Sequence, residues 1–295
     1  MTSSTCRWLF ACLLLGNTLT AHAAISLVDA TGTRVTLAAP AQRIISLAPH
    51  ITELLYAAGA GGRVVGATSY SDYPAAARAL PRVGGYAHID LEAVLALRPD
   101  LVVAWKSGNS AAQLDRLRAL GVAVYVSEPH RLDDIPTDIE HLGVLAGSED
   151  SAHAAAQEFR LRHARLAKRY AKRPPVTVFY EIWNPPLMTI NGEQIISDVL
   201  RLCGGVNLFA DLPVLAPTVD VEAVVQKNPE VIFMSDRRNR DANPDNPWQR
   251  WKGLRAVQAG NLFWIPPDLM QRQTPRILQG AEMLCADLER ARGRR

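Results

Sequence analysis

Histidine is the residue type in this 295-residue sequence that most readily binds a metal or moves a proton near neutral pH. After residue 23 the histidines are scattered, with no close pair at the spacing of a metal site. They are His50, His88, His130, His141, His153 and His163. The sequence also lacks the G-x-S-x-G, H-E-x-x-H and P-loop motifs of common enzyme classes. Positive evidence for catalytic chemistry is therefore missing, and an enzyme is the least favoured class of function.

Aromatic and polar residues gather instead in four loop segments that contain Pro or Gly. The segments are 68–74, 85–88, 182–188 and 266–272. Each follows a predicted strand or lies on its carboxyl side, where α/β proteins form ligand crevices. Ordinary loops with packing aromatics contain similar residues, but the shared placement favours a binding site. Aromatic faces with a few polar groups suit a large, flat ligand that carries amides.

Two carboxylates occupy equivalent places in an internal repeat. The stretch 90–103 (DLEAV, then PDLVV) returns as 220–233 (DVEAV, then PEVIF), so Glu92 and Glu222 each fall in the first turn of a short predicted helix. The helix dipole favours a carboxylate at this place. Two equivalent carboxylates would also suit a partner that is itself two-fold symmetric. The residues alone leave both interpretations open.

Short strands and short helices alternate on both sides of one long helical segment, which predicts an α/β protein with parallel sheets. A hairpin is expected over 25–38. Residues 149–172 carry apolar residues at three- and four-residue steps and are followed by Pro174-Pro175, as expected of a single long helix. We therefore expect two similar lobes joined by one rigid α-helix, with a ligand cleft between the lobes and only small opening motions. The expected boundaries are 24–147 for the N-terminal lobe, 148–173 for the connecting helix and 174–295 for the C-terminal lobe.

The first 23 residues predict a secretory signal peptide. One arginine, Arg7, precedes a short apolar run, and Ala21-His22-Ala23 is a small-x-small cleavage site. The run is too short for a membrane helix. We therefore expect a protein that is exported to an oxidising compartment, which the resemblance described below implies is the periplasm. Cys203 and Cys285 remain after cleavage, and an even cysteine count in an oxidising compartment favours one disulfide over two separate thiols.

The formal net charge of +3 is small, and the basic residues are dispersed. Their one local cluster, over 160–173, falls on the predicted long helix, where a solvated helix face is favoured over a nucleic-acid site. No nucleic-acid partner is expected.

Several motifs resemble those of the periplasmic cobalamin-binding proteins that serve the vitamin's ABC importer, within a wider family that also contains haem and siderophore binders. The motifs are R-I-I-S-L-A-P (43–49), T-E-L (52–54), S-Y-S-D-Y-P (69–74), P-D-L-V-V-A-W (99–105) with Gly108-Asn109, N-P-P (184–186), C-G-G (203–205) and Pro275-Arg276. The resemblance covers nearly the whole chain after residue 23. It implies a monomeric carrier that holds a corrinoid in its cleft, with no metal site or cofactor of its own.

The resemblance also implies roles for individual residues. It places around the ligand His50, Tyr70, Tyr86, Trp105, Asp268, Leu269, Met270, Gln271 and Arg272. It assigns Glu92 and Glu222 to docking on arginines of the two membrane subunits of the importer, and it pairs Cys203 with Cys285 in a disulfide.

The sequence departs from the family pattern at four positions. Tyr86 and Ala216 stand where the family has tryptophans, Leu187 stands where it has phenylalanine, and His50 replaces a small residue. A thinner aromatic wall is therefore expected on one side of the cleft. Because His50 and Tyr70 could both ligate iron, a haem or ferric-siderophore carrier of the same fold remains the alternative.

Overall fold

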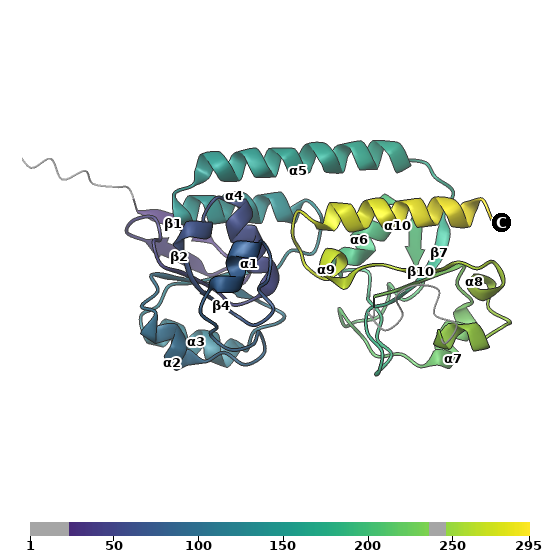
Figure 1. Ribbon diagram of the computed structural model, residues 1–295, viewed down its shortest axis with the longest axis horizontal. Helices are drawn as coiled ribbons and strands as arrows, with labels where there is room; N and C mark the ends of the chain where they lie inside the picture. The colour runs from purple at the N-terminus through teal and green to yellow at the C-terminus, as the bar shows by residue number, and fades with distance from the viewer. Residues whose placement is uncertain (1–23, 236–245) are drawn as a thin grey trace, which may run out of the picture.

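The computed structural model describes residues 24–235 and 246–295, and the predicted signal peptide over 1–23 lies outside the described residues. Two lobes lie side by side beneath one long helix (Figure 1). Each lobe is built on a four-stranded parallel sheet, so the predicted fold class is confirmed. Within the described residues, no helix combines the length and the apolar character that crossing a bilayer requires.

The N-terminal lobe begins with the predicted hairpin, in which Ile25 pairs with Leu37. The hairpin strands are β1 (Ile25–Val28) and β2 (Arg34–Leu37). The strands of the parallel sheet are β3 (Ile44–Ser46), β4 (Val64–Ala67), β5 (Leu101–Trp105) and β6 (Val124–Ser127), in the order β4-β3-β5-β6. The α-helices of this lobe are α1 (Pro49–Ala57), α2 (Leu91–Ala96), α3 (Ala111–Ala119) and α4 (Asp134–Ala146), with 3-10 turns η1 (Gly61–Arg63) and η2 (Ala75–Ala79).

The C-terminal lobe repeats this arrangement. Its strands are β7 (Val176–Glu181), β8 (Gly205–Asn207), β9 (Val231–Met234) and β10 (Leu262–Trp264), in the order β8-β7-β9-β10. Its helices are α6 (Ile195–Leu202), α7 (Val221–Lys227), α8 (Arg255–Gln258), α9 (Pro267–Met270) and α10 (Ile277–Arg292), with η4 (Pro247–Arg250). In both lobes the second strand along the chain flanks the first, and the third and fourth follow on its other side. The repeat seen in the sequence is therefore a repeat of topology.

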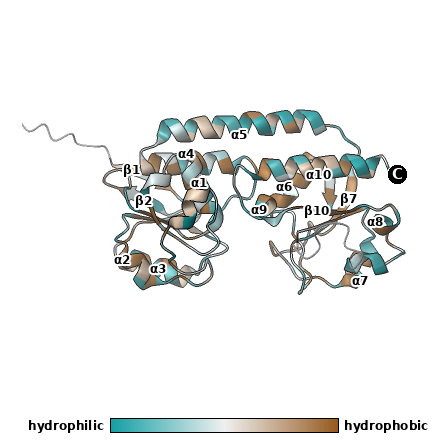
Figure 2. Cartoon of the chain, viewed as in Figure 1, coloured by the Kyte–Doolittle hydropathy of each residue, from teal (hydrophilic) through white to brown (hydrophobic). Residues whose placement is uncertain are grey.

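Helix α5 (Glu149–Tyr170) joins the lobes and lies within the predicted connecting segment. Its 22 residues span about 33 Å. Its buried residues recur along one stripe, and it packs against α4 of one lobe and α10 of the other. The buried residues of the stripe are Ala152, Ala156, Phe159, Leu166 and Tyr170. Figure 2 shows that the rest of α5 is mainly hydrophilic, whereas β7 and β10 are hydrophobic.

The approach of α4 to α5 depends on one glycine. A Cβ atom at Gly143 of α4 would lie 2.3 Å from the Cβ of Ala152 on α5. Because real side chains do not approach so closely, any larger residue at position 143 would push the connecting helix away from the N-terminal lobe. The small residues at this crossing therefore set how the N-terminal lobe is attached to α5.

Candidate ligand-binding site

A cavity of about 460 Å³ lies between the two lobes, within the range of about 300–1,000 Å³ that is usual for small-molecule sites. Trp105 ends β5, Pro129 and His130 follow β6, and Ile182 follows β7, so the carboxyl ends of both sheets face it. This is where α/β sheets bind ligands. The described residues that line the cavity are Trp105, Ser107, Glu128, Pro129, His130, Ile182, Gln194, Ile195, Val214, Leu215, Ala216, Gln271 and Gln273.

Trp105 is held in the wall of this cavity by the residues that follow it. The Asn109 carboxamide accepts a hydrogen bond from the Trp105 backbone N–H at 2.6 Å and donates to the carbonyls of Leu47 and Tyr86 at 3.0 and 2.6 Å. A Cβ atom at Gly108 would lie 1.8 Å from the indole ring. The W-x-x-G-N motif therefore forms a tight turn that holds the Trp105 side chain in the cavity wall.

His50 and Tyr86 both contact Trp105, but neither lies in the cavity wall. The His50 ring meets Trp105 edge-on with ring centroids 5.1 Å apart, and Tyr86 lies at 6.0 Å. His50 is only 3% exposed, and burial, assisted by the positive charge of Arg272, lowers its pKa to about 3. Its imidazole is therefore neutral. For His50 to reach a ligand, as predicted, its side chain or that of Trp105 would have to move.

The segment 268–272 divides between three environments. Gln271 lines the cavity, where its Nε2 donates to the Ile182 carbonyl at 2.9 Å. Met270 is fully buried in the core and Leu269 is half-buried, and both lie against Gly280 of α10. Asp268 and Arg272 form an ion pair at 3.2 Å. The structure thus brings Gln271 to the cavity but does not place Leu269, Met270, Asp268 or Arg272 in its wall.

Arg272 instead joins the two lobes. Its Nη1 donates to Glu53 at 2.9 Å and to Asp72 at 2.7 Å, and its Nη2 donates to the backbone carbonyl of Tyr70 at 3.3 Å. Burial opposes the charge on Asp72, but hydrogen bonding to Arg272 and its positive charge outweigh that effect and lower the pKa of Asp72. The Tyr70 side chain is 76% exposed and stands outside the cavity wall.

The pairing of Cys203 with Cys285 is confirmed. Their Cα atoms lie 4.9 Å apart, and the bridge ties the C-terminal end of α6 to the middle of α10. Both cysteines are fully buried.

Glu92 and Glu222 are exposed in the first turns of α2 and α7. The two helices share one burial pattern over their first residues, with a single buried valine, Val94 or Val224. Asp90 caps α2 by accepting a hydrogen bond from the Ala93 N–H at 3.0 Å, so capping there does not require Glu92. Figure 1 shows α2 and α7 at the ends of the two lobes that lie away from α5.

Several residues of the cavity wall were not predicted, chiefly Glu128, His130, Gln194 and Gln273. Glu128 and His130 directly follow strand β6, so the rule that pointed to the other strand ends could have found them. Gln273 lies one residue beyond the segment that was singled out. In the residues that the structure describes, histidine, cysteine and acidic side chains form no cluster able to hold a metal ion.

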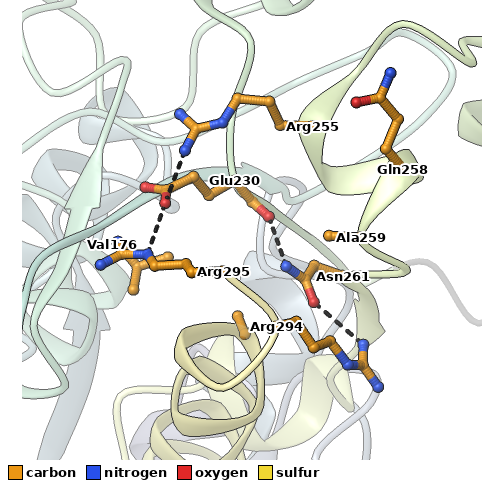
Figure 3. Close-up of a pocket in the computed structure, with 9 residues that line it drawn as sticks. Val176, Glu230, Arg255, Gln258, Ala259, Asn261, Arg294 and Arg295 are labelled. Atoms are coloured by element: carbon orange, nitrogen blue, oxygen red, sulfur yellow. Dashed lines mark hydrogen bonds and ion pairs between the residues drawn. The ribbon is translucent and has the colours of Figure 1, made fainter.

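A second cavity, of about 340 Å³, lies at the amino ends of strands in the C-terminal sheet, and Figure 3 shows residues that line it. Its arginines are engaged within the protein: Arg255 and Arg295 pair with Glu230, and Arg294 donates to Asn261. It is lined by the C-terminal lobe alone, at the beginnings of β7 and β9. The cavity between the lobes is therefore the better candidate.

A family model described as a periplasmic binding protein matches residues 44–269. The vitamin B12-binding protein of Vibrio cholerae is 40% identical over 251 residues, which are 85% of this chain and 90% of the relative.

Two solved structures show how far the likeness extends. The crystal structure of the periplasmic vitamin B12-binding protein BtuF of Vibrio cholerae has a TM-score of 0.81 at 40% identity and covers 86% of this chain and 98% of that one. The periplasmic haem-binding protein RhuT from Roseiflexus has a TM-score of 0.73 at 22% identity and covers 85% and 99%. At that lower identity the likeness to the haem binder is one of fold.

Proposed function

The chain belongs to the periplasmic binding protein family, and we propose that it captures cobalamin or a related corrinoid between its lobes and delivers it to an ABC importer. The family consists of solute-binding proteins without enzymatic activity, so the expectation that this chain is not an enzyme is confirmed. The cobalamin is a transported ligand, and proteins of this kind carry no cofactor.

The observation that carries the proposal is the cavity between the lobes, in a chain that is 40% identical to vitamin B12-binding proteins. The carboxyl ends of both parallel sheets meet there, and the wall is mainly apolar with a few polar groups. Trp105, backed by Tyr86, offers an aromatic face for a flat macrocycle. Such a wall suits binding without chemistry.

Calorimetric titration of the chain from residue 24 onward with cyanocobalamin, cobinamide and haemin tests the proposal. We expect one corrinoid per chain and much weaker binding of haemin. Saturable binding of haemin together with no heat from either corrinoid would contradict it.

Haem is the second candidate, because His50 carries a neutral imidazole whose Nε2 has no hydrogen-bond partner among the described residues. A neutral imidazole is a good ligand for iron. A bound haem with His50 on its iron would give a visible spectrum that changes in His50→Ala. The buried position of His50 behind Trp105 makes this candidate the weaker one.

Delivery to the importer would use Glu92 and Glu222. Both are exposed, neither has an ion-pair partner in the described part of the chain, and they occupy equivalent places in two lobes of the same topology. A permease made of two equivalent membrane subunits could meet each lobe with the same basic patch. The carrier itself would act as a monomer, and export to the periplasm would remove residues 1–23.

A further inference from the structure

We propose that this cavity recognises the carboxamide groups of its ligand and disfavours carboxylates, so that it accepts a macrocycle with amide side chains and rejects the same ring with acid side chains. The inference rests on the proposed function and goes beyond it, because it says which groups on the ligand are read and by which residues. Corrinoids carry primary carboxamides around the ring, whereas haem carries carboxylates.

Three glutamines from two segments of the C-terminal lobe line the cavity. Gln194 accepts a hydrogen bond from the Ile196 N–H at 2.6 Å through its Oε1, which leaves the amide nitrogen as its donor. Gln271 donates to the Ile182 carbonyl at 2.9 Å through its Nε2, which leaves Oε1 as its acceptor. The two amides are thus held in opposite senses, and together they offer both halves of the pairing that a carboxamide makes.

Two further polar atoms of the wall lack partners. Gln273 Oε1 and Trp105 Nε1 are both buried and have no hydrogen-bond partner among the residues described. They belong to opposite lobes, and both side chains line the cavity. An unpaired buried donor or acceptor is unfavourable. A small rotation of either side chain toward a ligand amide would pair it: the Gln273 oxygen needs an N–H, and the Trp105 nitrogen needs a carbonyl.

The charges of the wall oppose a carboxylate. Among the described residues of the lining, Glu128 is the one acidic residue and there is no lysine or arginine. Its carboxylate is fixed by Ser107, whose backbone N–H and hydroxyl donate to it at 2.7 and 3.0 Å. Arg272 and Arg276 are already paired with Glu53. A ligand carboxylate could accept from Gln194 Nε2 and Trp105 Nε1, but it would meet the like charge of Glu128 and leave the Gln273 oxygen unpaired. No lysine or arginine among the described residues of the lining would offset its charge.

Gln273 should distinguish most sharply between a carboxamide and a carboxylate on the ligand. Its carbonyl oxygen can accept from a ligand amide N–H. An ionised carboxylate, which is only an acceptor, could use the Nε2 donor of the same side chain but would leave this buried oxygen unpaired. A site whose polar groups are left unpaired by the wrong ligand discriminates more strongly than a purely apolar wall does. Gln273 is therefore a specificity-determining residue, and Glu128 supports it by its charge.

Calorimetric titration at pH 8 tests the inference. The probes are dicyanocobinamide and dicyanocobyrinic acid, which share the ring and differ in carboxamides against carboxylates, with cyanocobalamin as the reference. We expect the acid to bind at least about 100-fold more weakly, because a like charge within a site costs several kcal/mol. Gln273→Leu should weaken cobinamide binding by about 5- to 10-fold. Gln279→Leu, at an exposed position on α10, should leave it unchanged.

Glu128→Gln tests whether the charge of Glu128, and not only its place in the structure, affects ligand selectivity. It should raise the affinity for the acid by about 10-fold while changing the affinity for cobinamide much less. Equal affinities for the acid and the amide, or a Gln273→Leu variant that binds cobinamide normally, would overturn this inference and leave the proposed function standing. A protein that binds no corrinoid at all, cyanocobalamin included, overturns both.

Discussion

Arg276, the residue before α10, and Glu53 of α1 form a two-point ion pair between the lobes. Nε of Arg276 donates to Oε2 of Glu53 at 2.8 Å, and Nη2 donates to Oε1. The Glu53 side chain is only 2% exposed, and it also accepts from Arg272. The Arg276 guanidinium lies 4.0 Å from the ring centroid of Tyr73, which belongs to the N-terminal lobe. One buried carboxylate therefore holds two arginines of the opposite lobe.

Glu53→Gln should lower the free energy of unfolding by ~3–5 kcal/mol, because it leaves two largely buried arginines without their shared counter-charge. Urea unfolding followed by circular dichroism measures the change. Glu158→Gln, at an exposed position in the middle of α5, is the matched control and should change stability by less than ~0.5 kcal/mol. Equal stability of the two variants would show that the ion pair contributes nothing net.

Ligand binding should leave the radius of gyration almost unchanged. The lobes are joined both by the continuous helix α5 and by the Glu53 ion pairs, so opening requires bending a helix or separating buried charges. Small-angle scattering with and without cyanocobalamin measures this. A clear compaction on ligand addition would count against a rigid connection.

Asp138 of α4 should contribute to the stability of the folded protein in mild acid and lose that contribution near neutral pH. Burial raises the pKa of Asp138 to about 6; the Ser127 hydroxyl that donates to it opposes the rise, and the charges of Asp134 and Glu128 add to it. Since the folded pKa lies above the ordinary value of 3.8, this contribution is complete below about pH 4 and is lost as the pH rises through about 6.

Asp138→Asn should therefore increase the free energy of unfolding at pH 7.5, by up to ~3 kcal/mol, and change it little at pH 4. Urea unfolding at the two pH values measures the difference, with the exposed Asp211→Asn as the control. An increase of the same size at both pH values would mean that the charge of Asp138 is not the cause.

Replacing Cys203 and Cys285 by alanine should lower the free energy of unfolding by ~4–5 kcal/mol. The bridge closes a loop with a sequence separation of 82, and in the chain-entropy model such a loop restricts the unfolded chain by about this amount. Chemical unfolding without reductant compares the variant with the parent protein. Reaction with thiol reagents in the unreduced, denatured parent, prepared from residue 24 onward without Cys6 and Cys12, would contradict the prediction.

Glu92→Ala combined with Glu222→Ala should abolish complex formation with the importer and leave cobalamin affinity intact. Loss of one partner of a desolvated interfacial pair typically costs ~2–5 kcal/mol, and neither glutamate lines the cavity. Co-purification with the importer and calorimetry with cyanocobalamin measure the two properties. The control is Glu149→Ala with Glu158→Ala, two exposed positions on α5. Normal docking of the double variant would mean that the two glutamates interact favourably with the helix dipoles but are not needed for docking.

The sequence by itself determined the elements and their repetition. Periodicity and breakers are local, so the hairpin over 25–38, the alternating strands and helices and the long helix ending before Pro174 were all predictable. The repeat at 90–103 and 220–233 predicted two lobes, because the same sequence features of a short helix and a strand recur in the same order. The closing helix α10 went unpredicted, although buried residues recur along it at helical spacing.

Only the tertiary structure decided which side chains meet. Glu53 and Arg276 lie more than 200 residues apart in sequence, and nothing local to either indicates that α1 and the start of α10 come together across the lobes. The same packing places Met270 in the core, His50 behind Trp105 and Gln273 in the cavity wall. The carboxyl ends of the strands indicate where a cavity forms. The direction in which each side chain points depends on how the two lobes pack against helix α5.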